Sequence, residues 1–258
     1  MDYQTISSGI RFGVAVITLR RPEVMNALNT QMRAEIVDAV RRAGQEARAV
    51  VITGSGRAFC SGQDLGDRAN IANIDLERTL RDEYVPMLKA IVDCPVPTIA
   101  AVNGAAAGAG ANLALAADVV IAAESATFTQ AFARIGLIPD AGGTWVLPRL
   151  AGNAKAMGAA LFAERITARQ ADDWGMIWES VPDAEFEDRW WARARHLADG
   201  PTQAYAAIKR ALRSSWSNDL EGQLAVEARE QGGMGATRDF QEGVVAFLEK
   251  RPARFEGR

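Results

Sequence analysis

The feature that most constrains the fold of this chain is an alternation of short β-branched runs with segments of helical spacing. Residues 14–19 and 49–53 are apolar runs that predict buried strands, and residues 29–40 between them carry apolar side chains at helical spacing. The alternation continues with a helix and then two strands expected at residues 76–92, 98–102 and 118–122. Because strands and helices alternate along the chain, the sequence predicts an α/β domain.

Beyond about residue 195 the strand pattern stops and only helical segments follow. Helices are expected at residues 201–212, 220–229 and 239–250, and the glycine-rich residues 232–235 separate the last two. We therefore divide the chain into an α/β core of residues 1–195 and a C-terminal helical region of residues 196–258.

The composition excludes several classes of partner. The chain has 258 residues with 29 basic and 32 acidic side chains and a net charge of -3, and no cluster of Lys and Arg is dense enough for a nucleic-acid surface. The first residues lack the basic and apolar regions of a signal peptide, and no uncharged apolar run reaches the length of a membrane span. We therefore expect a cytoplasmic protein that binds neither nucleic acid nor membrane.

Histidine and cysteine offer little material for catalysis. His196 is the only histidine, which excludes a histidine-rich metal cluster, and its charged neighbours in a helical pattern favour a surface position. Cys60 and Cys94 are far apart in the sequence and are interpreted as reduced packing residues. No metal site is expected.

Two glycine-rich segments, residues 54–65 and 104–117, each follow a predicted strand. The first lacks the Gly-Lys-Ser/Thr ending of a phosphate loop, and the second, a helix-like run of small residues, lacks the third glycine of a dinucleotide fingerprint. Each segment can instead present an unpaired backbone N–H group. Two such groups together can hold one carbonyl oxygen as it becomes an enolate.

Asp140 is the only acidic residue between Arg134 and Arg149. In apolar surroundings burial would raise the pKa of its carboxyl toward neutrality, which would let the group both take and return a proton. An aspartate followed by small residues and a threonine is also typical of a helix start, where the side chain caps backbone N–H groups. From this segment alone both interpretations remain open.

Five ordered segments resemble the crotonase, or enoyl-CoA hydratase/isomerase, superfamily over nearly the whole chain. They are residues 21–28 (RPEVMNAL), 58–65 (AFCSGQDL), 101–114, 128–148 and 242–251. The resemblance implies a crotonase-like spiral of ββα units followed by C-terminal helices, with homotrimers or dimers of trimers as the assembly. It also implies an acyl-CoA thioester as the substrate and no separate cofactor.

The resemblance implies roles for individual residues. The backbone N–H groups of Gln63 and Ala109 would form an oxyanion hole for the thioester carbonyl, although the family usually has glycine at the position of Ala109. Asp140 lies where isomerases and some dehalogenases of the superfamily carry their acid. The remaining substrate and CoA contacts would come from Val24, Asn26, Ala27, Leu28, Ala58, Asp64, Leu65, Gly66, Asn112 and Phe132.

Two departures from the hydratase pattern bear on the reaction. Hydratases of the superfamily use two glutamates to add water, and this chain has Asn112 and Phe132 at those positions. One carboxylate suffices for a proton shuttle, so Asp140 favours an isomerase. Residues 128–149 are most similar to the ring-1,2-epoxyphenylacetyl-CoA isomerases of phenylacetate degradation. This similarity implies conversion of an epoxide to an oxepin, migration of an enoyl double bond, or both.

Alternative functions stay open at this point. A hydratase-like reaction is one, and a dehalogenase that uses Asp140 as a nucleophile is another, although that branch needs a histidine base and His196 lies outside the active-site motifs. A protein of another class would bind acyl-CoA without catalysis.

The acyl pocket itself is only partly defined by the sequence. Asn112 could hydrogen-bond the ligand or a water molecule, or it could stabilise the neighbouring helix. Large aromatic side chains could border an aryl pocket but more often serve packing or subunit contacts, and the candidates are Trp145, Trp174 and Trp178. The pocket's shape also depends on residues 70–84 and on the C-terminal helices, whose placement does not follow from periodicity.

Overall fold

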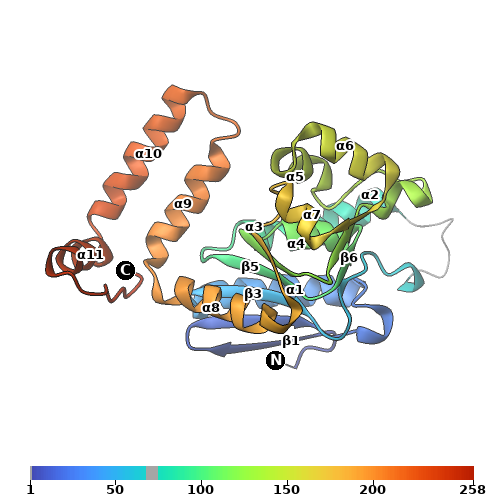
Figure 1. The fold of residues 1–258 in the computed structure, drawn as a ribbon, viewed down its shortest axis with the longest axis horizontal. Helices are drawn as coiled ribbons and strands as arrows, with labels where there is room; N and C mark the ends of the chain where they lie inside the picture. Colours follow the sequence, from blue (N-terminus) through green and yellow to red (C-terminus); the bar gives the residue numbers. More distant parts are fainter. Residues whose placement is uncertain (1, 68–74) are drawn as a thin grey trace.

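The computed structural model describes residues 2–67 and 75–258, and its strands form two sheets (Figure 1). The larger sheet has the strand order β1 (Ile6–Arg11), β2 (Val14–Leu19), β3 (Ala49–Gly54), β5 (Thr98–Val102), β7 (Val119–Ala123) and β10 (Glu179–Val181). Its neighbouring strands are parallel except β1 and β2. The smaller sheet has the order β4 (Ala58–Cys60), β6 (Ala105–Ala107), β8 (Thr127–Thr129) and β9 (Arg165–Thr167), and within it β8 and β9 are antiparallel.

The chain passes from one sheet to the other in a repeating order. β3 is followed by β4, β5 by β6 and β7 by β8, and a helix follows each pair. The expected α/β fold with ββα turns is therefore confirmed. Because β4, β6 and β8 are parallel neighbours, the segments after them leave the small sheet at the same edge. Those segments contain Gln63, Ala109 and Phe132.

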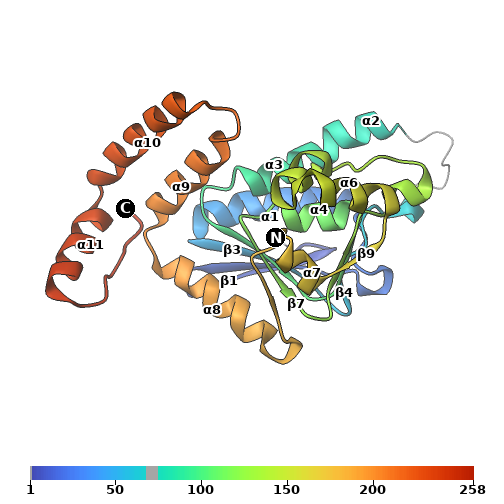
Figure 2. The ribbon, with the colours of Figure 1, turned by 45° about the horizontal axis from the view of Figure 1, so that its top comes forward.

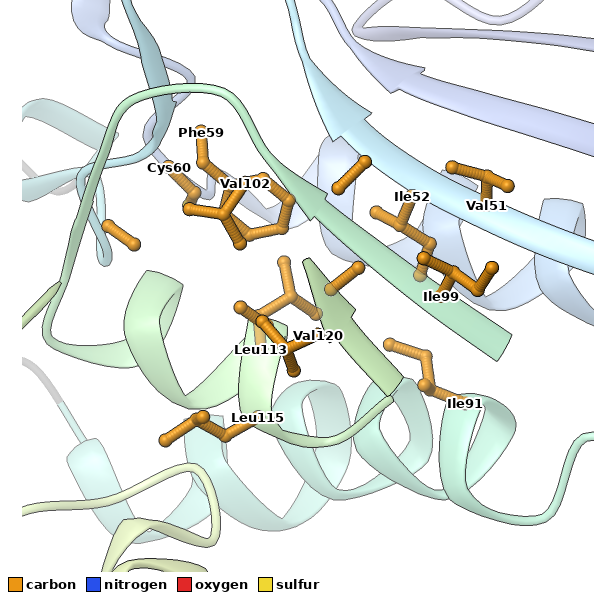
Figure 3. Packing of buried hydrophobic residues seen from close by; sticks show 14 of the residues in the cluster. Val51, Ile52, Phe59, Cys60, Ile91, Ile99, Val102, Leu113, Leu115 and Val120 are labelled. Carbon is orange, nitrogen blue, oxygen red and sulfur yellow. The ribbon is translucent and has the colours of Figure 1, made fainter. Parts of the chain in front are cut away.

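Helices cover both faces of the larger sheet. Figure 2 shows α8 (Phe186–Asp199) on the opposite side of this sheet from α1 (Thr30–Glu46), α3 (Val85–Val92) and α4 (Ala109–Leu115). The side chain of Asn29 caps α1 by accepting a hydrogen bond from the Met32 N–H at 2.8 Å. Figure 3 shows the resulting core, in which Ile99 and Val120 of the sheet lie near Ile91 of α3 and Leu113 of α4.

Two segments differ locally from their expected structure. The helix expected at residues 76–92 consists of α2 (Leu76–Thr79), a π-helical turn (Leu80–Tyr84) and α3. The wide turn stands next to Pro86, which cannot donate an N–H to the helix ladder, and the Val85 N–H bonds the Leu80 carbonyl. The helix-like run at residues 104–117 begins with β6, because small residues also fit a short strand between two neighbours, and becomes helical only in α4.

The segment between β8 and α8 contains five further helices, the last of them a 3-10 helix (Asp183–Glu185) just before α8, and the outer strands β9 and β10. A 3-10 helix (Ala131–Ile135) is followed by α5 (Gly143–Leu150), α6 (Gly152–Phe162) and α7 (Ala168–Asp173). α5 contacts both α4 and α6, and α6 contacts the first 3-10 helix. This segment therefore lies beside the start of α4.

The C-terminal helices α9 (Thr202–Ser214), α10 (Leu220–Gly235) and α11 (Arg238–Glu249) extend to one side of the two-sheet core (Figures 1 and 2). Lys209 of α9 joins them to the core by donating to the carbonyls of Cys94 and Val96 at 2.7 and 2.8 Å. The expected break at residues 232–235 is wrong, because these residues form the end of α10. Each glycine in a helix lowers helix stability by only about 1 kcal/mol relative to alanine. The helix can therefore continue through these residues.

The division expected after residue 195 falls inside α8, which packs on the larger sheet. A subunit-contact role for the helices beyond it stays a prediction. None of the described helices is both long and apolar enough to cross a bilayer.

Candidate active site

The loops that follow β4 and β6 meet at the start of α4. Gly62 has a φ of +95°, and a Cβ atom added to it would lie 2.7 Å from the Ala107 carbonyl oxygen and 3.4 Å from the Ala109 nitrogen. Gly108 has φ +52° and ψ −127°, a conformation that side-chain-bearing residues rarely adopt. The two glycines therefore allow the two backbones to touch.

Two backbone N–H groups are left unpaired at this contact. The neighbouring groups are used: the Leu28 N–H donates to the Gly62 carbonyl at 2.8 Å, and the Gly108 N–H donates to the Thr129 carbonyl at 2.8 Å. Within residues 2–67 and 75–258, the N–H groups of Gln63 and Ala109 have no hydrogen-bond acceptor. Ala109 is the first residue of α4, where N–H groups lack a helical partner.

A buried polar network holds the side chain of Gln63. Its Oε1 atom accepts hydrogen bonds from Tyr84 Oη and from Arg33 Nη1, the latter at 3.0 Å. The same Arg33 nitrogen donates to the Leu28 carbonyl at 2.6 Å, and the other end of the guanidinium is ion-paired with Glu83. Arg33 is only 1% exposed, so these contacts fix the first loop from inside the protein.

Asp140 lies just before α5 and does not cap it. The N-cap position is Gly142, and the Asp140 carbonyl, not its carboxylate, accepts the Gly143 N–H at 2.8 Å. The helix-cap interpretation of this side chain is therefore wrong. Its Oδ1 atom is buried and finds no partner in the described part of the chain. Burial raises the pKa of the Asp140 carboxyl to about 6, and a hydrogen bond from its own backbone opposes the rise.

The acid and the first loop lie within electrostatic reach of each other. Burial raises the pKa of Tyr84, the charge of Arg33 opposes that rise, and the charge of Asp140 adds to it. Asp140 is therefore close enough for its charge to act on Tyr84, whose hydroxyl bonds the Gln63 side chain.

Asn112 and Phe132 line the second loop. Asn112 is 1% exposed, and its Nδ2 donates to the Asp140 carbonyl at 2.7 Å while its Oδ1 accepts from Gln130 Nε2 at 2.9 Å. The ring of Phe132 is 6% exposed and would lie 3.7 Å from a Cβ atom added to Gly108. Asn112 thus bonds the acid-bearing turn that leads into α5, which agrees with the interpretation that it stabilises the neighbouring helix.

Comparison with known proteins places this geometry in a family. The family model described as enoyl-CoA hydratase/isomerase matches residues 9–258. This chain belongs to the enoyl-CoA hydratase/isomerase family. A relative from Rhodobacter capsulatus, named "Probable enoyl-CoA hydratase", is 65% identical over 258 residues, with 100% of each chain covered. The 1,2-epoxyphenylacetyl-CoA isomerase of Escherichia coli is 45% identical over 259 residues, with 98% of each chain covered.

The fold gives the same result. The solved structure of an enoyl-CoA hydratase from Bacillus anthracis superposes with a TM-score of 0.92 at 32% identity, covering 99% of this chain and 100% of the other. The crotonase-like fold expected from the sequence is therefore confirmed.

The early loop expected to contact CoA is tightly folded in this family member. Met25 and Asn26 adopt left-handed φ values of 53° and 56°. The Asn26 side chain is fully buried, accepts the Arg21 N–H at 2.9 Å and donates to the Ala58 carbonyl at 2.8 Å. Ala27 is 6% exposed, and Leu28 and Ala58 are buried, so these residues shape the loop. Val24 is 37% exposed at its surface.

The end of the first loop is polar and more open. Asp64 is ion-paired with Arg21 at 2.8 Å, and its Oδ1 accepts the Gly66 N–H at 2.9 Å. Leu65 is 60% exposed and begins a 3-10 helix (Leu65–Asp67). Of the pocket segment expected at residues 70–84, residues 70–74 lie outside the described residues.

Trp145 lines a cavity together with Asn112 and Gly142, whereas Trp178 and the histidine are exposed. Trp145 is 52% exposed beneath the guanidinium of Arg149, and Trp178 is 61% exposed. Trp174 is partly buried beside Lys155. His196 is exposed on α8, as expected.

The cysteines are buried and unpaired, as the sequence indicates. Burial raises the pKa of the Cys60 thiol to about 12, which disfavours the reactive thiolate. Among the described residues, no group of three His, Cys, Asp or Glu side chains gathers in a metal-binding arrangement.

Sequence reasoning missed Arg33, Tyr84 and Gln130. Arg33 had a usable signal, since it stands four residues before Val37 on the face of α1 that packs inward. Tyr84 and Gln130 bond residues at sequence separations of 21 and 18, and periodicity carries no information about such pairs.

Proposed function

We propose that this enzyme is an acyl-CoA isomerase in which Asp140 shuttles a proton while the N–H groups of Gln63 and Ala109 hold the thioester oxygen. The observation that carries the proposal is the half-buried Asp140 carboxyl, whose Oδ1 atom has no partner within the described chain and whose pKa is about 6. A carboxyl with a pKa near neutrality is suited to both accepting and returning a proton.

The proposed reaction divides the work between the backbone and one side chain. The two unpaired N–H groups stabilise negative charge that develops on the thioester oxygen when a proton leaves the carbon next to the carbonyl. Asp140 takes that proton and returns it to another carbon of the same acyl group. For an enoyl group, the double bond moves toward the carbon that lost the proton. For a ring epoxide, the C–C bond shared with the three-membered ring breaks to give a seven-membered oxepin ring, and the proton returns to a ring carbon. In both cases no atom is gained or lost.

The acyl group that we propose is ring-1,2-epoxyphenylacetyl, converted to the oxepin thioester, with migration of an enoyl double bond as a reaction of the same equipment. The 45% identity to the Escherichia coli isomerase, across 98% of both chains, supports the aryl epoxide. The apolar ring of Phe132 against the second loop also supports a substrate with a flat apolar part. The CoA thioester is itself the substrate, and we propose no further cofactor.

Hydration is the second candidate, because the 65% identical relative is named as a hydratase. Addition of water requires one group to activate the water and another to exchange the proton on carbon. The amide of Asn112 is occupied by Asp140 and Gln130, and Phe132 has no group that can activate water. These contacts favour isomerisation over hydration.

A panel of substrates tests the proposal. Purified protein is incubated separately with 2-(1,2-epoxy-1,2-dihydrophenyl)acetyl-CoA, a 3-enoyl-CoA and a 2-enoyl-CoA, and products are identified by mass spectrometry and absorbance. We expect turnover of the epoxide, the 3-enoyl thioester or both, without a gain of 18 mass units. Rapid hydration of the 2-enoyl-CoA alone would overturn the proposal in favour of a hydratase. Recovery of all three thioesters unchanged would identify a binding protein.

The assembly that we propose is a homotrimer or a dimer of trimers formed through the C-terminal helices. Supporting this, a groove of about 1080 Å³ lies between α9, α10 and α11, and Phe247 and Leu248 on α11 are 83% and 73% exposed. Light scattering during size-exclusion chromatography measures the mass directly. A monomer of 27.7 kDa at micromolar concentration would contradict the expectation.

A further inference from the structure

The turn that carries Asp140 has an unusual backbone. The Asp140 carbonyl accepts the Gly143 N–H at 2.8 Å, and the two residues between them, Ala141 and Gly142, have φ values of +48° and +81°. Positive φ at both central positions is the pattern of a type I′ turn. Because alanine disfavours the left-handed region by about 1 kcal/mol, this turn needs support from its surroundings.

Asn112 supplies a second hydrogen bond to that turn. Its Nδ2 donates to the same Asp140 carbonyl at 2.7 Å. This oxygen therefore accepts two hydrogen bonds, one from the Gly143 N–H and one from the Asn112 side chain. Gln130 Nε2 donates to Asn112 Oδ1 at 2.9 Å, which orients the Asn112 amide with its N–H groups toward Asp140. Asn112 and Gln130 are each 1% exposed, so water does not compete for these bonds.

Asn112 is packed directly against Gly143. A Cβ atom added to Gly143 would lie 2.4 Å from Asn112 Nδ2 and 3.0 Å from its Cγ. Residue 143 can therefore remain in place only as glycine while Asn112 keeps its position. Asn112 also stands one turn after Ala109 on α4, so it joins the acid-bearing turn to the helix that begins with the unpaired N–H.

We propose that Asn112, oriented by Gln130, is a positioning residue that fixes the Asp140 carboxyl relative to the Ala109 N–H. This inference rests on the proposed function of Asp140 and Ala109 and extends it to a residue that does not contact the reacting atoms. It assigns the amide at position 112 a role that a carboxylate of the same size cannot perform, because a carboxylate has no N–H to donate.

Asn112→Asp is the central variant for the test. It keeps the size of the side chain and the acceptor for Gln130, and in its ionised form it cannot donate to the Asp140 carbonyl, so kcat is measured at alkaline pH. We expect kcat to fall about 10- to 100-fold, because small misplacements of a catalytic group have effects of that size. The dissociation constant for phenylacetyl-CoA, which lacks the epoxide, should change less than about 3-fold, since the thioester and CoA contacts are unchanged. Asn153→Asp, an exposed position in α6, controls for the added charge and should leave kcat unchanged.

A second pair of variants separates positioning from space filling. Asn112→Ala removes the amide and leaves a void, whereas Asn112→Ala combined with Gly143→Ala places a methyl group 2.4 Å from the former position of Nδ2 and partly fills that void. We expect the double variant to recover thermal stability relative to Asn112→Ala while its kcat stays low. A double variant with kcat near wild type would show that Asn112 only fills space and would overturn the proposal.

Two further measurements distinguish failure of the positioning role from failure of the proposed function. They are crystal structures of the variants and the activity of Asp140→Asn. In Asn112→Asp the turn at residues 140–143 should be displaced, and an unmoved turn would overturn the positioning role whatever the activity. If Asp140→Asn retains wild-type turnover, the proposed function fails. If Asp140→Asn is inactive but Asn112→Asp has wild-type kcat, only the positioning role fails.

Discussion

The two sides of the candidate site depend on the sequence in different ways. The proposed oxyanion side consists of the unpaired backbone N–H groups of Gln63 and Ala109, and the glycines at positions 62 and 108 allow these loops to touch. The acid side consists of one side chain, Asp140. A backbone N–H group is still present after most substitutions of its residue, whereas a carboxylate is lost when its side chain is replaced. The oxyanion side should therefore tolerate changes of side chain but not of backbone shape, and the acid side should show the reverse.

The largest effect is expected from Asp140→Asn. The amide keeps the size of the side chain but cannot carry a proton, so kcat should fall about 100- to 10,000-fold. Binding of phenylacetyl-CoA, measured by calorimetry, should remain within about 3-fold of wild type. Asp188→Asn, an exposed position on α8, is the matched control and should be fully active. Turnover of Asp140→Asn near the wild-type rate would show that the Asp140 carboxylate is not required for the reaction.

Gly62→Ala should have the next largest effect. The new Cβ would meet the Ala107 carbonyl at 2.7 Å in a residue with φ +95°, so the two loops must separate. Loss of alignment of an oxyanion donor lowers kcat by about 100- to 1,000-fold. Gly152→Ala is the matched control, because Gly152 also has a positive φ of +74° but open space around its Cβ position. The control should lose about 1 kcal/mol of stability and little activity.

The difference between the two sides also explains what the sequence could predict. The α/β fold follows from alternating apolar runs, and the oxyanion side was expected from glycine-rich segments that follow strands. Both signals are local in sequence. The sequence identifies Asp140 as an isolated acid that could be a helix cap or a proton shuttle. These two interpretations differ only in the partner of its carboxylate. That partner depends on tertiary packing.

The polar contacts that support each side could not be predicted in the same way. Asn112 bonds the Asp140 carbonyl across a separation of 28 residues, and Arg33 bonds Gln63 across 30. The first pair forms because the parallel strands of the small sheet bring the segments after β6 and β8 to one edge, whereas Arg33 reaches Gln63 from α1. Neither periodicity nor residue type specifies which buried amide meets which carbonyl.

The pH dependence of stability tests the environment of Asp140 directly. The pKa of this carboxyl rises from 3.8 to about 6 on folding, so the folded state binds the proton more tightly than the unfolded state. The free energy of unfolding should therefore fall as pH rises from about 4 to about 6. Above pH 6 the carboxyl is ionised in both states, and the whole loss of stability caused by its burial is present. Allowing for the solvent that reaches this half-buried group, the penalty is about 1 to 2 kcal/mol.

Asp140→Asn removes that penalty and supplies the measurement. Urea unfolding at pH 7 should show the variant to be more stable than wild type by about 1 to 2 kcal/mol, and the gap should close toward pH 4. A variant less stable than wild type at pH 7 would mean that the carboxylate is well solvated or paired in the folded protein. The acid side would then lack the raised pKa on which its proposed role depends.

The smallest effect is expected from Tyr84→Phe, which changes only the support of the oxyanion side. The substitution removes the hydroxyl that donates to Gln63 Oε1, but Arg33 still donates to the same oxygen at 3.0 Å. Loss of one of two hydrogen bonds to a side chain costs about 1 kcal/mol, so kcat should fall about 3- to 10-fold. Tyr205→Phe in α9 is the control for loss of a hydroxyl group, and its kcat should equal that of the wild type. If Tyr84→Phe instead matches the loss in Gly62→Ala, the position of the Gln63 N–H depends on its side chain, and the two sides of the site are equally sensitive to single side chains.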